Sequence, residues 1–124
     1  MAIGVLTVDD QRIFQRAIAS LIDAAPEFVR VGAASSGPEA LELAAALRPD
    51  LVLLDVRMPG MDGIETARRL AAVDPRPVVV LISIDALPDA EAALASSGAA
   101  ACVRKQDLSP RTLHELWAAN AGQR

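Results

Sequence analysis

The stretch LVLLDVRMPGMDG, Leu51 to Gly63, runs four apolar residues directly into an aspartate and then into a loop with Pro and Gly. Its first part is typical of a central strand that is buried on both faces. Asp55 therefore stands at the end of a buried strand, where an ionised carboxylate is costly unless other groups pair with it. We expect those partners to come from other parts of the chain.

Short apolar runs alternate with helical periodicities along the rest of the sequence, which is typical of a parallel sheet with helices on both faces. The apolar runs predict strands at 3–8, 28–33, 51–55, 77–83 and 100–105. Amphipathic patterns predict helices within 11–24, 35–50, 64–74, 87–98 and 109–120. The fold class is therefore α/β, with five βα units in a single domain.

Helix boundaries are marked by residues suited to capping. Ser36 with Glu39 forms a possible capping box, and Asp62 and Ser109 are plausible N-caps of two later helices. Gly98 is suited to ending the fourth helix.

Composition excludes several functional classes. The 124 residues suit one domain, and 12 basic against 16 acidic residues give a net charge of −4, so we expect no direct binding of nucleic acid by this chain. A single cysteine, Cys102, cannot form an internal disulfide, and no secretory leader opens the sequence, which indicates a cytoplasmic protein. No apolar run approaches the roughly 18 residues of a membrane helix.

Five polar residues follow the predicted strands at what should be one edge of the sheet. Carboxyl ends of parallel strands meet at the same edge, where ligands bind. Crowded carboxylates favour a hard cation such as Mg²⁺, which attracts phosphate, and a carboxylate can attack a phosphoryl group. We therefore expect Asp55 to be a phosphoryl acceptor. The five residues are Asp9, Asp10, Asp55, Ser83 and Lys105.

Simpler interpretations of individual residues remain open. Asp9 or Asp10 could cap the first helix, and Cys102 is interpreted as a small buried hydrophobe. His114 is interpreted as a solvated side chain. Arg68 and Arg69 are interpreted as a solvated helix face.

The motifs VDD at 8–10, LLDVRMPGMDG at 53–63 and VRK at 103–105, with Ser83 ending an apolar strand, resemble the receiver domain of bacterial two-component response regulators. The motif sequences are most similar to those of the subfamily whose receivers precede a LuxR-type (NarL/FixJ-like) helix-turn-helix output domain. The resemblance implies a flavodoxin-like doubly wound sheet of order 2-1-3-4-5. It also implies a receiver domain over 1–120, with 121–124 starting a linker or tail.

The resemblance further implies a mechanism. Asp55 would take a phosphoryl group from a sensor histidine kinase, as a signalling phosphoacceptor rather than an enzyme. The ligands of Mg²⁺ would be Asp9, Asp10, Asp55 and the backbone carbonyl of Arg57. Lys105 would pair with the phosphoryl oxygens and Ser83 would hydrogen-bond one of them. Phosphorylation would promote a homodimer, and DNA would be contacted only through an output domain outside this chain.

Two positions depart from the family pattern. Cys102 stands at the switch position, where the family usually has Tyr or Phe, and Ile84 stands where the residue is usually small. We expect Ile84 to narrow access to the site. Cys102 keeps open a phosphorylation-independent interaction module as an alternative. A Mg²⁺-dependent phosphatase is disfavoured because Arg57 stands where such an enzyme needs a second acid.

Overall fold

The computed structural model describes residues 2–123, which form one layered α/β domain. The strands are β1 (Ile3–Val8), β2 (Phe28–Ala34), β3 (Leu51–Asp55), β4 (Val78–Ser83) and β5 (Ala101–Arg104). The α-helices are α1 (Arg12–Asp23), α2 (Gly37–Leu47), α3 (Gly63–Leu70), α4 (Ala90–Ser97) and α5 (Pro110–Asn120). Two 3₁₀ turns, η1 (Lys105–Asp107) and η2 (Ala121–Gln123), complete the described elements.

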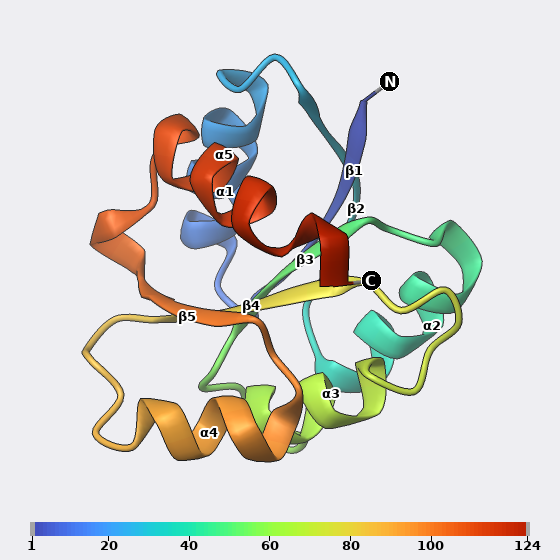
Figure 1. The fold of residues 1–124 in the computed structure, drawn as a ribbon, viewed down its shortest axis with the longest axis vertical. Coiled ribbons are helices and arrows are strands. Elements are labelled where there is room, and N and C mark those ends of the chain that lie inside the picture. Colours follow the sequence, from blue (N-terminus) through green and yellow to red (C-terminus); the bar gives the residue numbers. More distant parts are fainter. Residues whose placement is uncertain (1, 124) are drawn as a thin grey trace.

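The five strands form one parallel sheet in the order β2-β1-β3-β4-β5, as predicted. Helices α1 and α5 cover one face, and α2, α3 and α4 cover the other (Figure 1). Each face has its own apolar core, because side chains of β1, β3 and β4 alternate between the two sides. All of β3 and β4 is buried, which explains their uninterrupted apolar sequences.

Several predicted boundaries shift. The third helix was expected to extend to residue 74 but ends at Leu70, ahead of the segment with Pro75 and Pro77. Proline lacks a backbone donor and disfavours helical geometry in the residue before it, so this segment cannot continue the helix. The last strand ends at Arg104, because Lys105 begins η1. Residues 121–123 of the predicted tail form η2, and Arg124 lies outside the described residues.

The predicted N-caps are confirmed. The side chains of Ser36, Asp62 and Ser109 accept hydrogen bonds from the backbone N–H three residues later, at 3.3, 2.9 and 3.0 Å. The predicted capping box differs in one bond, because the Glu39 carboxylate accepts from the backbone N–H of Ser35. Gly98 ends α4 with a φ of 76°, a left-handed conformation that favours glycine.

The capping interpretation of Asp9 and Asp10 is wrong. The N-cap of α1 is Gln11, whose side chain makes no capping hydrogen bond. Asp9 instead accepts a hydrogen bond from the backbone N–H of Gln11 at 2.8 Å, just before the helix. This turn leaves the second carboxylate oxygen of Asp9 available to other partners.

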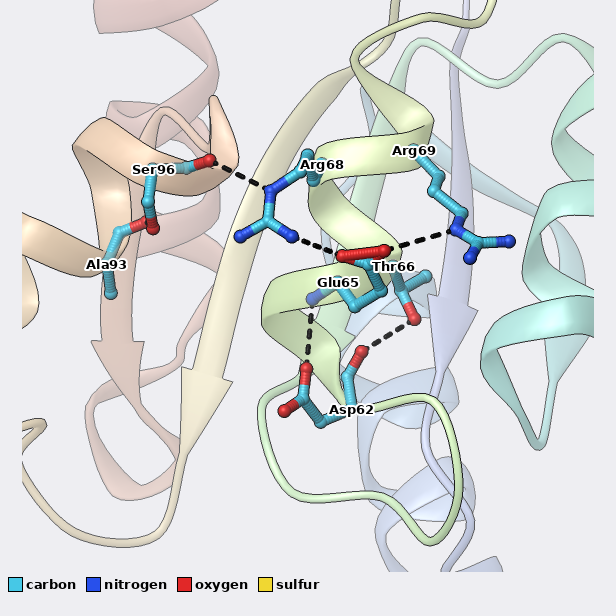
Figure 2. Close-up of polar contacts among 7 residues, drawn as sticks. All are labelled: Asp62, Glu65, Thr66, Arg68, Arg69, Ala93 and Ser96. Carbon is cyan, nitrogen blue, oxygen red and sulfur yellow. Dashed lines mark hydrogen bonds and ion pairs between the residues drawn. The ribbon is translucent and has the colours of Figure 1, made fainter.

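Charged side chains that were interpreted as merely solvated make specific contacts. Glu65 on α3 pairs with both Arg68 and Arg69, and Arg68 also donates a hydrogen bond to the backbone carbonyl of Ser96 on α4 (Figure 2). His114 Nδ1 on α5 lies 3.0 Å from a carboxylate oxygen of Glu27, ahead of β2. These contacts are exposed, so each contributes little stability, but Arg68 does tie α3 to α4. None of the helices within residues 2–123 is long and apolar enough to cross a membrane.

Candidate functional site

The predicted site residues come from four strand ends at one edge of the sheet. Asp9 follows β1, Asp55 is the last residue of β3, Ser83 is the last residue of β4, and Lys105 follows β5. The carboxylate oxygens of Asp9, Asp10 and Asp55 lie within 4.8 Å of one another. The parallel order of the strands thus brings together groups that are up to 96 residues apart in sequence.

Lys105 is the cation of this cluster. Its Nζ atom lies 3.0 Å from Oδ2 of Asp9 and 4.0 Å from Oδ1 of Asp55. The side chains of Lys105 and Asp9 are 12% and 3% exposed, so the shorter pair is almost removed from water. Charge-assisted hydrogen bonds of this kind are stronger than neutral ones, and Asp9 therefore receives most of the neutralisation that Lys105 can provide.

Asp55 remains under-neutralised. Burial is the largest cause that raises its pKa from 3.8 to about 6, and the negative charges of Asp9 and Asp10 raise it further. The charge of Lys105 and the backbone N–H of Arg57, which donates to Oδ1 at 3.3 Å, lower the same pKa but do not offset burial. A second cation near Asp55 would therefore be favourable.

The donor set fits a hard divalent cation. Three carboxylates lie near one ammonium, which leaves excess negative charge. The ligand atoms that the three acids offer to a metal ion are carboxylate oxygens. Mg²⁺ prefers oxygen ligands, usually one or two carboxylates together with several waters. Asp10 is exposed while Asp9 and Asp55 are buried, so the cluster has a side open to solvent for those waters.

A pocket of about 370 Å³ opens beside Asp55 and Lys105. The loop after β4 forms one wall of it, with Ile84 and Leu87, and Arg57 contributes from the loop after β3. Ile84 is 60% exposed at this wall. The pocket has room for a small phosphorylated group next to the Asp55 carboxylate, with apolar side chains on one side of the entrance.

The family model described as Response regulator receiver domain matches residues 5–117, nearly the whole chain. The chain belongs to the response regulator receiver family. As the domain of two-component response regulators, a receiver is a signalling phosphoacceptor, which agrees with the strand-end acids and the lysine found in this chain.

Two solved structures and one curated relative illustrate the similarity. The signal receiver domain of the response regulator NarL from Mycobacterium tuberculosis is 31% identical with a TM-score of 0.86, over 99% of this chain and 98% of that one. A LuxR-family two-component response regulator from Aurantimonas sp. SI85-9A1 is 25% identical with a TM-score of 0.86, over 100% and 88%.

The curated relative is the protein-glutamate methylesterase/protein-glutamine glutaminase 3 of Pseudomonas syringae pv. syringae (strain B728a), which is 42% identical over 84 residues. The match covers 68% of this receiver but only 22% of that protein. The relatives thus include both a LuxR-family response regulator and a protein-glutamate methylesterase. The comparisons therefore show the receiver family, and the expected LuxR-type subfamily stays a prediction.

Sequence reasoning missed a residue that holds the backbone beneath the acids of this receiver. The Gln15 amide on α1 donates to the backbone carbonyls of Asp9 and Ala34, at 3.0 and 2.8 Å, and accepts a hydrogen bond from the Thr7 hydroxyl at 2.7 Å. Gln15 thereby ties the ends of β1 and β2 together. The sequence does place Gln15 in the helix that follows the VDD motif, close to the predicted acids. A polar residue on a helix is ordinarily solvated, however, so its position alone did not predict these hydrogen bonds.

Ser83 and Cys102 are neighbours on β4 and β5 of the receiver. The Ser83 hydroxyl donates to the backbone carbonyl of Asp85, so its proton is held within the loop after β4. The Ser83 side chain lies close enough to lower the pKa of the Cys102 thiol, but burial dominates and raises that pKa. A cavity of about 320 Å³ adjoins Cys102, with Ala86 and Ala90 among its lining residues. Cys102 was expected to be a small buried hydrophobe, and it is half-buried and packs against the core beneath α2, α3 and α4.

Proposed function

We propose that this receiver accepts a phosphoryl group on Asp55 from the phosphohistidine of a sensor histidine kinase. The observation that supports the proposal is the convergence of three carboxylates and Lys105 beside a pocket that reaches Asp55. This arrangement suits phosphoryl transfer, which depends mainly on positioning and charge neutralisation.

In the proposed step, an oxygen of the ionised Asp55 carboxylate attacks phosphorus while the phosphorus–nitrogen bond of the donor breaks. The electron pair of that bond returns to the imidazole, and Asp55 becomes an acyl phosphate. Lys105 would move its ammonium from Asp9 towards the new phosphoryl oxygens, from a starting distance of 4.0 Å to Asp55. When bound, Mg²⁺ would supply further neutralisation of phosphoryl oxygens.

The proposed ligands of Mg²⁺ are those that the resemblance implies. Asp10 and Asp55 would bind by carboxylate, Asp9 mostly through water, and Arg57 through its backbone carbonyl. The backbone N–H of Arg57 already donates to Asp55, which places this part of the chain next to the acids.

The proposed switch is a rearrangement of the loop after β4. Ser83 would exchange its hydrogen bond to Asp85 for one to a phosphoryl oxygen and draw the loop inward. Cys102, whose thiol lies beside the Ser83 side chain, would sense this change in place of the usual aromatic residue. The altered surface would then promote a homodimer.

For the output, we propose transcriptional control through a LuxR-type DNA-binding domain, with residues 1–120 as the receiver and 121–124 leading into a linker. The similarity to NarL and to a LuxR-family regulator supports it. A methylesterase output is the second candidate, because that class of relative is 42% identical over 84 residues.

Intact mass after incubation with Mg²⁺ and acetyl phosphate tests the phosphorylation proposal, with Asp55→Asn as the control and size-exclusion chromatography alongside. We expect one added phosphoryl group on the wild type and none on the variant. A shift towards dimer would support switching through Cys102. The absence of an adduct when Mg²⁺ binds would overturn the proposal and favour a phosphorylation-independent interaction module, which the missing aromatic residue at Cys102 also suggests.

A further inference from the structure

An aromatic ring lies against the charged end of Lys105. The Nζ atom lies over the ring of Phe14, 3.9 Å from its centroid. Phe14 stands in the first turn of α1, four residues after Asp10, and it packs half-buried against the core between the sheet and α1 and α5. An ammonium this close to a ring face is attracted by the ring quadrupole.

The contact matters because Lys105 has little water around it. Its side chain is 12% exposed, and the ammonium meets Asp9 on one side and Asp55 on another. The Phe14 ring covers a further side with a surface that attracts the cation but offers no hydrogen-bond acceptor. A carboxylate or carbonyl at that place would hold the lysine by a directional bond and compete with phosphoryl oxygens. A ring face attracts the ammonium without a fixed bond direction, so the ammonium can shift between Asp9 and Asp55 and keep its cation–π contact.

We propose that Phe14 is a positioning residue for phosphoryl transfer, which holds the Lys105 ammonium between Asp9 and Asp55 by a cation–π contact. The inference rests on the proposed function of Asp55. It differs from a purely structural role for Phe14, in which any apolar side chain of similar size would serve.

The contact itself can be tested without metal or phosphate. Lys105 is the only lysine of the sequence, so protein labelled with carbon-13 lysine gives a single set of lysine signals in NMR spectra. We expect the signals of the methylene next to Nζ to be shifted upfield by the ring of Phe14. The shift should disappear in Phe14→Leu and persist in Phe14→Tyr. Ordinary lysine shifts in the wild type would overturn the proposal.

The role in the reaction is tested by phosphorylation rates with Mg²⁺ and acetyl phosphate. Fluorinated phenylalanines at position 14, with one, two and three fluorine atoms, keep the ring shape but weaken its quadrupole stepwise. We expect the logarithm of the rate to fall with each step, while Phe14→Tyr stays near the wild type. Phe14→Leu should lower the rate about three- to tenfold, the size expected of a partly desolvated cation–π contact.

The other phenylalanine provides a matched control, because Phe28 is buried in the same core and has no cation contact among the described residues. The fluorinated series at Phe28 should leave the rate unchanged. Equal rates throughout the series at Phe14 would overturn the positioning role, even if Phe14→Leu proves unfolded. A wild type that takes no phosphoryl group would instead refute the proposed function, while the NMR measurement still decides the Phe14 contact.

Discussion

The ammonium of Lys105 lies 3.0 Å from Oδ2 of Asp9, a residue 96 positions earlier in the chain. Both side chains are nearly buried, so this pair is strongly coupled. Lys105 is 1 Å farther from Asp55, at 4.0 Å, and the pKa of Asp55 is raised to about 6. The uneven sharing of one lysine between two acids is the basis of the first prediction.

The Asp55 carboxylate should make stability depend on pH. Between about pH 4 and pH 6 the folded state holds a proton on Asp55 that the unfolded state has already released, because the pKa is 3.8 unfolded and about 6 folded. Stability therefore falls as pH rises through this range. Asp55→Asn removes the free-energy cost of holding an ionised carboxylate in the folded site. We expect this variant to stabilise the metal-free protein by about 2 kcal/mol at neutral pH and hardly at all near pH 4.

Chemical denaturation at a series of pH values, in the presence of a chelator, measures this difference. Asp23→Asn is the control, since Asp23 is exposed at the end of α1. A difference between the wild type and Asp55→Asn that stays constant from about pH 4 to pH 7 would contradict the raised pKa.

Binding of Mg²⁺ should depend on Asp10. This carboxylate is exposed, and its oxygen lies within 4.8 Å of ligand atoms on Asp9 and Asp55. We expect Mg²⁺ to raise the melting temperature of the wild type, and Asp10→Asn to weaken Mg²⁺ binding by about tenfold or more. Isothermal titration calorimetry measures the affinity. Asp107→Asn, an exposed acid outside the cluster, should bind like the wild type, and equal affinities for all three proteins would place the ion elsewhere.

Gly63 should be intolerant of any side chain. A Cβ atom there would lie 2.3 Å from the carbonyl oxygen of Asp55 and 2.6 Å from Cα of Val56, and these backbone atoms cannot move without moving the site. We expect Gly63→Ala to lower the free energy of unfolding by about 3 kcal/mol. Gly60→Ala provides a contrast, because nothing lies within 4 Å and only its φ of 75° is unfavourable, at a cost of about 1 kcal/mol. Urea denaturation measures both, and equal costs would refute the steric argument.

Ile84 should slow exchange between the pocket and solvent. It lines the pocket beside Asp55 and is 60% exposed, so Ile84→Ala should change stability by less than about 0.5 kcal/mol. A smaller side chain opens the entrance to donor and to water. We expect faster labelling by acetyl phosphate and a shorter lifetime of phosphorylated Asp55, both followed by intact mass. The labelling rate and the phosphorylated lifetime of Ile84→Val should lie between those of the wild type and Ile84→Ala. An unchanged lifetime in Ile84→Ala would refute the role of Ile84 as a barrier.

The fold was predictable because its signals are local. The apolar run of β3 and the amphipathic pattern of α1 each lie within a few consecutive residues, so they can be recognised from the sequence. The parallel arrangement of the strands then places their carboxyl ends at one edge of the sheet. The same rule predicts from the sequence that Asp9, Asp55 and Lys105 lie at one edge of the sheet. Boundaries were less predictable where prolines and a 3₁₀ turn ended the elements early.

The sequence by itself therefore determined the α/β architecture and which residues meet at the edge of the sheet. Only the tertiary structure decided how those residues share their contacts: that Lys105 lies nearer Asp9 than Asp55, that Phe14 covers its ammonium, and that Gln15 holds the backbone below. Periodicity is a property of neighbouring residues, whereas pairing and pKa depend on differences of about 1 Å between groups that packing brings together from distant parts of the chain.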